Sequence, residues 1–198
     1  MALLRYAITL LLVVAIPAAI GYCLLIHPFA RFWRRHGPRT AYLAVLPVIT
    51  AIMAGMFLLR DRLLARDLGT NGPLALLGIL LLVLSGWLRL KLGKHLTVRI
   101  LVGVPELSAV PGEMLSDGLY ARIRHPRYAQ MTLALLGYAL IANYPAAYAA
   151  FLCWCAGISL VARLEERELR DRFGDPYRDY CQRVPRFLPR IRRPFTEP

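Results

Sequence analysis

The sequence has few acidic residues and little that could bind a metal. Of its 198 residues only 12 are Asp or Glu, against 25 Lys and Arg, so the formal net charge is +13. The four cysteines form no CxxC pair and no His/Cys spacing of a metal site. We therefore expect no metal centre, and we interpret the cysteines as small packing residues.

The sequence also lacks any motif of a nucleic-acid-binding fold, any internal repeat and any low-complexity tract. A basic charge of this size is typical of nucleic-acid binding, but attraction to anionic lipid headgroups explains the arginines more simply. We expect membrane lipids, and not nucleic acid, as partners.

Apolar residues are abundant instead. They make up 58% of the chain, with a mean hydropathy of +0.48, whereas about 45–50% is usual in globular domains. A helix needs about 20 apolar residues to cross a bilayer. Five runs approach this length: Tyr6–Ile26, Ala41–Leu59, Pro73–Leu90, Tyr128–Ala142 and Ala146–Ala162. The sequence thus predicts an all-α, polytopic membrane helix bundle of about five transmembrane helices with a cytoplasmic C-terminal cap.

Two of these runs need a further argument. The first run exceeds the roughly 7–15 apolar residues of a secretory signal, so we expect it to be retained. The fourth run is short, but Tyr128 and Tyr144 stand where interfacial aromatic residues anchor a span.

The basic residues predict the orientation. The first loop, the segment between the third and fourth spans and the tail hold 21 of the 25 Lys and Arg, and the remaining positions hold four. Because positive residues favour the cytoplasmic side, we expect the N-terminus outside and the tail in the cytoplasm. We expect a multi-pass protein of a bacterial inner membrane.

The chain divides into two parts. Residues 1–95 hold three spans and basic loops, and we interpret them as a scaffold on the expected substrate side. Residues 96–198 hold the segment "LTVRILVGVPELSAVPGEMLSDG", two spans and the tail. Its prolines and glycines make that segment too broken to span, which predicts a membrane-edge or re-entrant loop.

The last two spans predict a pocket. They form a helical hairpin that turns at "NYP", and at 1.5 Å per residue its two arms differ by only about 8 Å. Arg124, His125 and Tyr128 at one end are therefore expected to face Glu165 and Glu166 at the other. Cationic and acidic groups together suit an α-amino acid group, such as that of S-adenosylmethionine.

Simpler interpretations of the same residues stay open. The arginines of "GLYARIRHPRYA" would serve equally as headgroup anchors, and the glutamates as a solvated helix end. His125 precedes Pro126, which suits the first turn of a helix, so the histidine would also serve as a cap.

Two segments carry a family resemblance. "GLYARIRHPRYA" and "LEERELRDRFGDPYRDYCQRVPRFLP" resemble the C-terminal signature of the isoprenylcysteine carboxyl methyltransferase family and its phospholipid methyltransferase relatives. The resemblance covers about residues 116–190, and the first three spans match only as generic membrane helices. It implies an integral-membrane methyltransferase that uses S-adenosylmethionine and releases S-adenosylhomocysteine.

The resemblance also implies roles for individual residues. It places the cofactor between Arg124, His125, Pro126 and Tyr128 on one side and Glu165 and Glu166 on the other, with Gly118 and Tyr120 shaping the opening. Arg186 would lie by the reacting end, and His125 or a glutamate would serve as base for an amine acceptor. Gln130 departs from the pattern, since the family often has glycine there.

A membrane site suits a lipophilic small-molecule or lipidated acceptor. We expect an isoprenylcysteine-type carboxylate first, then a phospholipid amine, then a small thiol. The segment after Phe173 is expected to lie on the membrane surface and to cap the site. Two alternatives from other classes are an NADPH-dependent, sterol-reductase-like oxidoreductase and a membrane scaffold without enzymatic activity.

Overall fold

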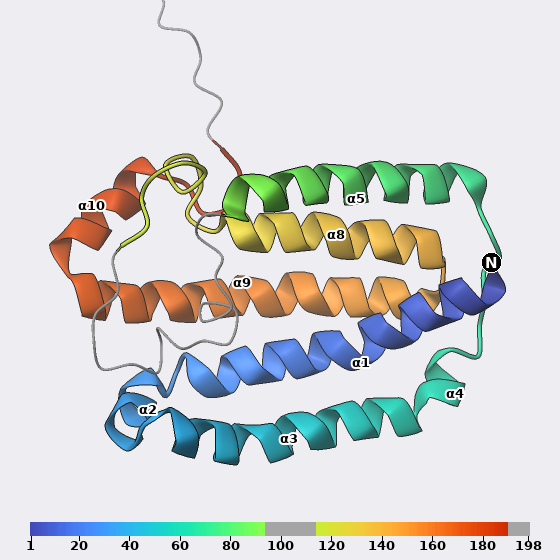
Figure 1. Ribbon diagram of the computed structural model, residues 1–198, viewed down its shortest axis with the longest axis horizontal. Coiled ribbons are helices and arrows are strands. Elements are labelled where there is room, and N and C mark those ends of the chain that lie inside the picture. Colours follow the sequence, from blue (N-terminus) through green and yellow to red (C-terminus); the bar gives the residue numbers. More distant parts are fainter. Residues whose placement is uncertain (94–113, 190–198) are drawn as a thin grey trace, which may run out of the picture.

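The computed structural model describes residues 1–93 and 114–189, which form helices and no strands (Figure 1). Five long helices lie side by side: α1 (Ala2–Ile26), α3 (Pro38–Leu58), α5 (Gly72–Leu92), α8 (Pro126–Ala142) and α9 (Pro145–Phe173). Three short helices lie at their ends: α2 (Ala30–His36), α4 (Arg60–Leu63) and α10 (Asp175–Arg183). The predicted loop of residues 96–118 lies mostly outside the described residues.

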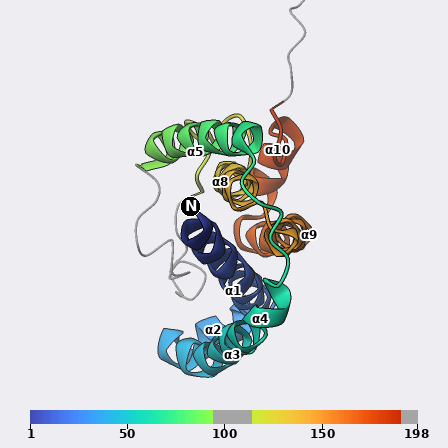
Figure 2. The same cartoon turned by 90° about the vertical axis from the view of Figure 1, so that its right-hand side faces the viewer.

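The predicted membrane bundle is confirmed. Among the described residues, α1, α3, α5 and α9 are long and apolar enough to cross a membrane. The 17-residue α8 is the short fifth helix, and it lies between α5 and α9 (Figures 1 and 2). With 29 residues, α9 is about 44 Å long, so its last turns, after Ala162, extend beyond a hydrocarbon core of about 30 Å.

Proline and asparagine mark the helix boundaries. Pro38, Pro126 and Pro145 each begin a long helix, where a missing N–H group costs no hydrogen bond. Asn143 ends α8 with a left-handed backbone (φ 52°), which asparagine tolerates better than most residues. The turn "NYP" therefore reverses the chain between α8 and α9, as predicted.

Two glycines bring α5 and α8 into close contact. A Cβ atom on Gly78 would lie 2.6 Å from the carbonyl oxygen of Gly137, so neither position accepts a larger residue without separating the helices. Nearer the other end of the same contact, Gln130 Nε2 donates to Ser85 Oγ at 2.6 Å, and Ser85 donates to the Gln130 carbonyl at 3.1 Å. Gln130 thus joins α8 to α5.

The apolar residues fall into a core and a lipid-facing surface. Residues of α1 and α9 pack together in the largest buried cluster, which includes Leu12, Val13, Ile16, Trp154, Ile158 and Val161. Large apolar side chains on α3 and α5 remain exposed, among them Leu43, Leu46, Leu76, Leu80 and Val83. Such a continuous exposed apolar surface is suited to contact with lipid chains.

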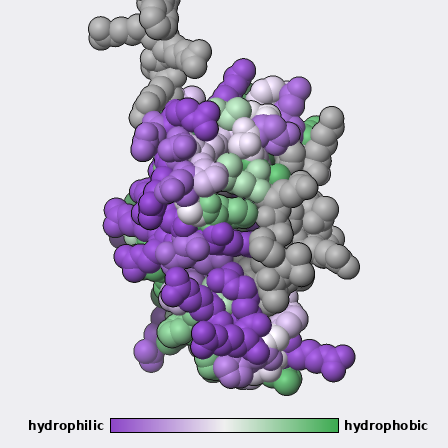
Figure 3. Space-filling model, turned by 90° about the vertical axis from the view of Figure 1, so that its left-hand side faces the viewer, coloured by the Kyte–Doolittle hydropathy of each residue, from purple (hydrophilic) through white to green (hydrophobic). Residues whose placement is uncertain are grey.

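The two ends of the bundle differ. The N-terminus lies at one end, with α4 and the α8–α9 turn, and α2 and α10 lie at the other, which we call the α10 end (Figure 1). The surface of the α10 end is mostly hydrophilic (Figure 3). The chain thus separates an apolar middle from a polar end.

Arg5 organises the N-terminal end. Its side chain is only 5% exposed, it forms an ion pair with Asp67, and its Nε donates to the Ala142 carbonyl at 2.9 Å. Tyr144 donates its hydroxyl to the other oxygen of Asp67 at 3.2 Å. One arginine therefore joins α1 to the loop before α5 and to the α8–α9 turn.

We expect Arg5→Ala to lower the stability of the bundle. The substitution leaves the buried Ala142 carbonyl without its donor, which costs about 1–3 kcal/mol. Thermal unfolding in detergent measures the loss. Asp61→Ala removes the exposed Arg60–Asp61 pair and is the control, because exposed pairs contribute about 0–1 kcal/mol. Equal midpoints for the two variants would contradict this role for Arg5.

Candidate active site

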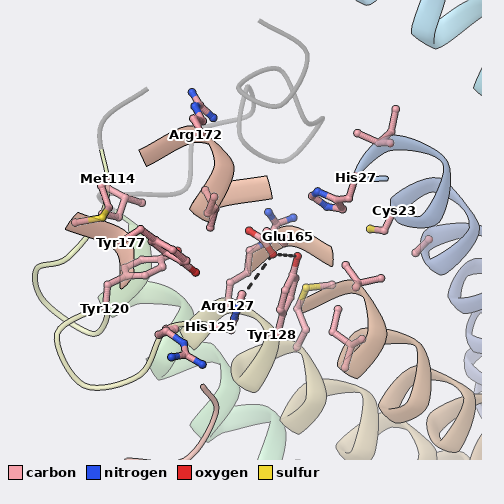
Figure 4. A pocket seen from close by; sticks show the side chains of 18 of the residues that line it. Cys23, His27, Met114, Tyr120, His125, Arg127, Tyr128, Glu165, Arg172 and Tyr177 are labelled. Carbon is pink, nitrogen blue, oxygen red and sulfur yellow. Dashed lines mark hydrogen bonds and ion pairs between the residues drawn. The ribbon is translucent and has the colours of Figure 1, made fainter. Parts of the chain in front are cut away.

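A cavity of about 560 Å³ opens among α1, α8, α9 and α10 (Figure 4). This volume lies within the roughly 300–1,000 Å³ of small-molecule sites. Polar groups of Tyr120, His125, Tyr128 and Glu165 line it toward the α10 end, and deeper in the bundle its wall is apolar, with Ile20, Met131, Trp154 and Ile158. The cavity therefore connects a charged rim to the membrane-spanning part of the protein.

Glu165 presents a carboxylate to this cavity. Tyr128 donates its hydroxyl to Glu165 Oε2 at 2.7 Å, and His125 Nδ1 lies 3.6 Å from the same oxygen. The His125 ring stacks on Tyr128, with centroids 5.2 Å apart and planes 9° apart. The Glu165 side chain keeps 23% of its surface exposed, so a bound molecule can reach it.

Glu166 lies behind the cavity wall and is fully buried. Its Oε1 accepts from Arg124 Nε at 3.0 Å, from His125 Nε2 at 3.1 Å and from Arg186 Nε at 2.9 Å. Its Oε2 accepts from Arg186 Nη2 at 2.6 Å and from Arg170 Nη2 at 3.4 Å. We call these five residues the Glu166 cluster, and within it one carboxylate holds three guanidinium groups and an imidazole together.

The cluster keeps Glu166 ionised. Burial alone would raise the pKa of Glu166, but the hydrogen bonds from Arg186 and His125 and the charge of Arg124 outweigh it and hold the pKa well below its usual range. A lowered carboxyl pKa stabilises the fold at pH values above the ordinary carboxyl pKa, and this contribution is lost as the pH falls through the folded pKa. Glu166 therefore stabilises the fold across the neutral range.

The tail after α10 pairs with the chain before α8. The Arg124 N–H donates to the Pro185 carbonyl at 2.8 Å, and the His125 N–H donates to the Arg186 carbonyl at 3.1 Å. Phe187 lies against His125, with ring centroids 5.8 Å apart. These contacts hold the residues at the start of α8 in place.

Helix α10 adds side-chain contacts to the same segment. Tyr180 donates its hydroxyl to the Tyr120 carbonyl at 2.6 Å, and Arg124 Nη1 donates to the Cys181 carbonyl at 2.8 Å. Burial raises the pKa of Tyr180 to about 12, so its hydroxyl remains a donor at neutral pH. The tail through residue 189 thus lies over the α10 end of the bundle, and residues 190–194 of the predicted cap lie outside the described residues.

The structure brings the predicted residues into two adjacent groups. The cavity wall includes Tyr120, Arg124, His125, Tyr128 and Glu165. The other predicted residues lie beside this wall: Pro126 begins α8, Gly118 occupies a turn with φ 55°, and Glu166 and Arg186 pair within the Glu166 cluster. The predicted meeting of the two hairpin ends is therefore observed, and the functional roles remain predictions.

The contribution of α1 to the cavity was not predicted from the sequence. Cys23 and His27, one helical turn apart, both line the cavity from this helix, and Arg127 and Arg172 line it from α8 and α9. The signal for His27 was a polar residue at the end of an apolar run, directly before Pro28. Within residues 1–95, which the sequence indicates as a scaffold, a single histidine does not stand out.

No group of three or more His, Cys, Asp or Glu side chains within residues 1–93 and 114–189 is placed to hold a metal ion. The site instead consists of arginine, carboxylate, imidazole and tyrosine groups above an apolar pocket. A membrane bundle with such a cavity suits an integral membrane enzyme.

Comparison with known families identifies which enzyme class this is. Residues 74–176, from α5 through α8 and α9 to the start of α10, match a profile of the phospholipid methyltransferase family. The match covers more than half of the chain, and the chain belongs to this family of membrane methyltransferases. No curated protein and no solved structure matches the chain.

Proposed function

We propose that the protein transfers a methyl group from S-adenosylmethionine to the headgroup amine of a phospholipid. The observation that carries the proposal is the cavity, whose charged rim and apolar depth lie within one space of about 560 Å³. Such a space accommodates a charged cofactor at the rim and a lipid chain below it.

The residues of the rim fit the cofactor. Its α-ammonium group would meet Glu165, and its carboxylate would meet the cationic side formed by Arg124 and Arg127, since all three residues line the cavity. When bound, S-adenosylmethionine supplies a methyl group that its positive sulfur already activates. The chain then has to orient the two molecules and exclude water. The tail over the α10 end serves the second task.

Both the family and the apolar wall support a phospholipid acceptor. Ile20, Met131, Trp154 and Ile158 surround the deeper part of the cavity, where an acyl chain would lie. The family's description names phospholipids, and for this reason we place the amine before the carboxylate that the sequence favoured.

An isoprenylcysteine-type carboxylate is the second candidate. Arg127 and Arg172 both line the cavity and would attract an anionic acceptor. An ionised carboxylate needs no base, so the two acceptors differ in their demand for proton transfer.

The distribution of basic residues supports an orientation as well. Since 21 of the 25 Lys and Arg lie within residues 31–39, within residues 89–127 and after Ala162, we propose that the α10 end is cytoplasmic. The cofactor would then enter from the cytoplasm.

Ligand binding and methyl transfer test the proposed function. We expect S-adenosylmethionine and S-adenosylhomocysteine to stabilise the detergent-solubilised protein, by about 2.7 kcal/mol at 100 times the dissociation constant. NADPH serves as the control and should give no shift. Labelled S-adenosylmethionine should methylate dioleoylphosphatidylethanolamine more than N-acetyl-farnesylcysteine. A shift with NADPH alone would contradict the proposal, and so would the absence of transfer to both acceptors.

A further inference from the structure

His27 ends α1 at the rim of the cavity. It is only 9% exposed, and its Nδ1 atom is buried and has no hydrogen-bond partner among the described residues. Most buried polar atoms in proteins have a partner, and one without a partner calls for an explanation. A polar group of a bound molecule would provide one.

The position of His27 indicates which molecule this is. Figure 4 shows the imidazole directed from α1 into the cavity, across from Tyr128 and Glu165. Cys23 and Ile20 line the same cavity one and two turns deeper along α1. His27 thus stands where the charged rim meets the apolar wall, and an acceptor with its chain in the deeper part would place its headgroup there.

The other candidate bases of the site are already occupied. His125 Nε2 contacts Glu166 Oε1 at 3.1 Å, and its Nδ1 faces Glu165 Oε2 at 3.6 Å. Glu165 accepts from Tyr128 and is the carboxylate that faces a cofactor ammonium group. In the tautomer that carries its proton on Nε2, His27 offers an unused lone pair on Nδ1.

We propose that His27 Nδ1 takes a proton from the headgroup amine of the phospholipid that is methylated. This inference rests on the proposed function. The ammonium group gives one proton to Nδ1 and becomes a neutral amine. The freed lone pair then bonds the methyl carbon, and the carbon–sulfur bond breaks with its electron pair left on sulfur. His27 afterwards releases the proton toward the charged rim.

The assignment extends the site beyond the part of the chain that matches the family. The matched region begins at residue 74, whereas His27 directly follows α1. The side of the cavity from α8 and α9 would bind the cofactor, and the side from α1 would deprotonate the acceptor. Substitution of His27 should therefore lower the rate of methyl transfer and leave the affinity for the cofactor nearly unchanged.

The test compares His27→Ala, His27→Asn and the control His36→Leu, which removes an exposed histidine of α2. The assay measures transfer of a labelled methyl group to dioleoylphosphatidylethanolamine in mixed micelles. Calorimetry measures the affinity for S-adenosylhomocysteine. We expect kcat of His27→Ala to fall about 100- to 10,000-fold, as for the loss of a general base. Its affinity for S-adenosylhomocysteine should stay within about twofold, because the contacts that bind the cofactor remain.

Two further measurements separate proton transfer from a structural role. The Asn amide can occupy the place of Nδ1 and form a hydrogen bond, but it is not basic, so His27→Asn should keep the wild-type KM and the low kcat. Added imidazole should restore part of the rate of His27→Ala. If His27→Ala does not fold, the Asn variant carries the test, since S-adenosylhomocysteine binding reports an intact site.

Several results would overturn the inference. They are a wild-type rate in His27→Ala or His27→Asn, a loss of S-adenosylhomocysteine affinity that parallels the loss of rate, and methylation of N-acetyl-farnesylcysteine alone. The last excludes His27 as a base, because an ionised carboxylate has no proton to give. A wild-type protein that binds no S-adenosylhomocysteine would instead contradict the proposed function itself.

Discussion

Glu166→Gln should destabilise the protein by about 3–5 kcal/mol, the cost of removing one partner from a buried ionic group. The carboxylate is fully buried and accepts hydrogen bonds from Arg124, His125, Arg170 and Arg186. The amide has nearly the same shape, but it leaves the three arginines without a counter-charge. The midpoint of thermal unfolding in detergent measures the effect.

The control for this prediction is Asp171→Asn. It removes an ion pair with Arg31 on the same face of the protein, but the side chains are 76% and 50% exposed. Such a pair contributes about 0–1 kcal/mol. If Glu166→Gln unfolded at the same temperature as the control, the Glu166 cluster would have no structural role.

Glu165→Gln should have the opposite profile, a large loss of cofactor affinity with little loss of stability. A charge-assisted hydrogen bond contributes about 1.5–3 kcal/mol, so the affinity for S-adenosylhomocysteine should fall about 10- to 150-fold. The fold should tolerate the change, because Glu165 is partly exposed and the Gln oxygen can still accept from Tyr128. Calorimetric titration with S-adenosylhomocysteine measures this affinity in Glu165→Gln and in the control Asp171→Asn. An unchanged affinity in Glu165→Gln would show that Glu165 does not bind the cofactor.

These two neighbours show where prediction from the sequence ended. Glu165 and Glu166 were expected to share one role, because the hairpin geometry gives their height along α9 but not the direction of each side chain. Successive helical residues point about 100° apart, and only the packed structure shows that Glu165 faces the cavity while Glu166 faces Arg124 and Arg186.

The spans were predictable for a physical reason. Each needs a long apolar run to cross a bilayer, and the predicted Tyr128–Ala142 differs from α8, Pro126–Ala142, by only two residues at its start. Contacts between segments far apart in the chain leave no comparable pattern in the sequence. The pairing of Arg124 with Pro185 joins residues 61 positions apart, and the turn of α1 that brings His27 into the cavity depends on how α1 packs against α9.

The dependence of the Glu166 cluster on Arg186 has a consequence for biogenesis. All five long helices precede Arg186 in the chain, so the bundle can insert while Glu166 still lacks the guanidinium that binds both of its oxygens. Chains fold from their N-terminal part during synthesis. We therefore expect the bundle to insert before the α10 end is complete, and the Glu166 cluster to form only after the tail has left the ribosome.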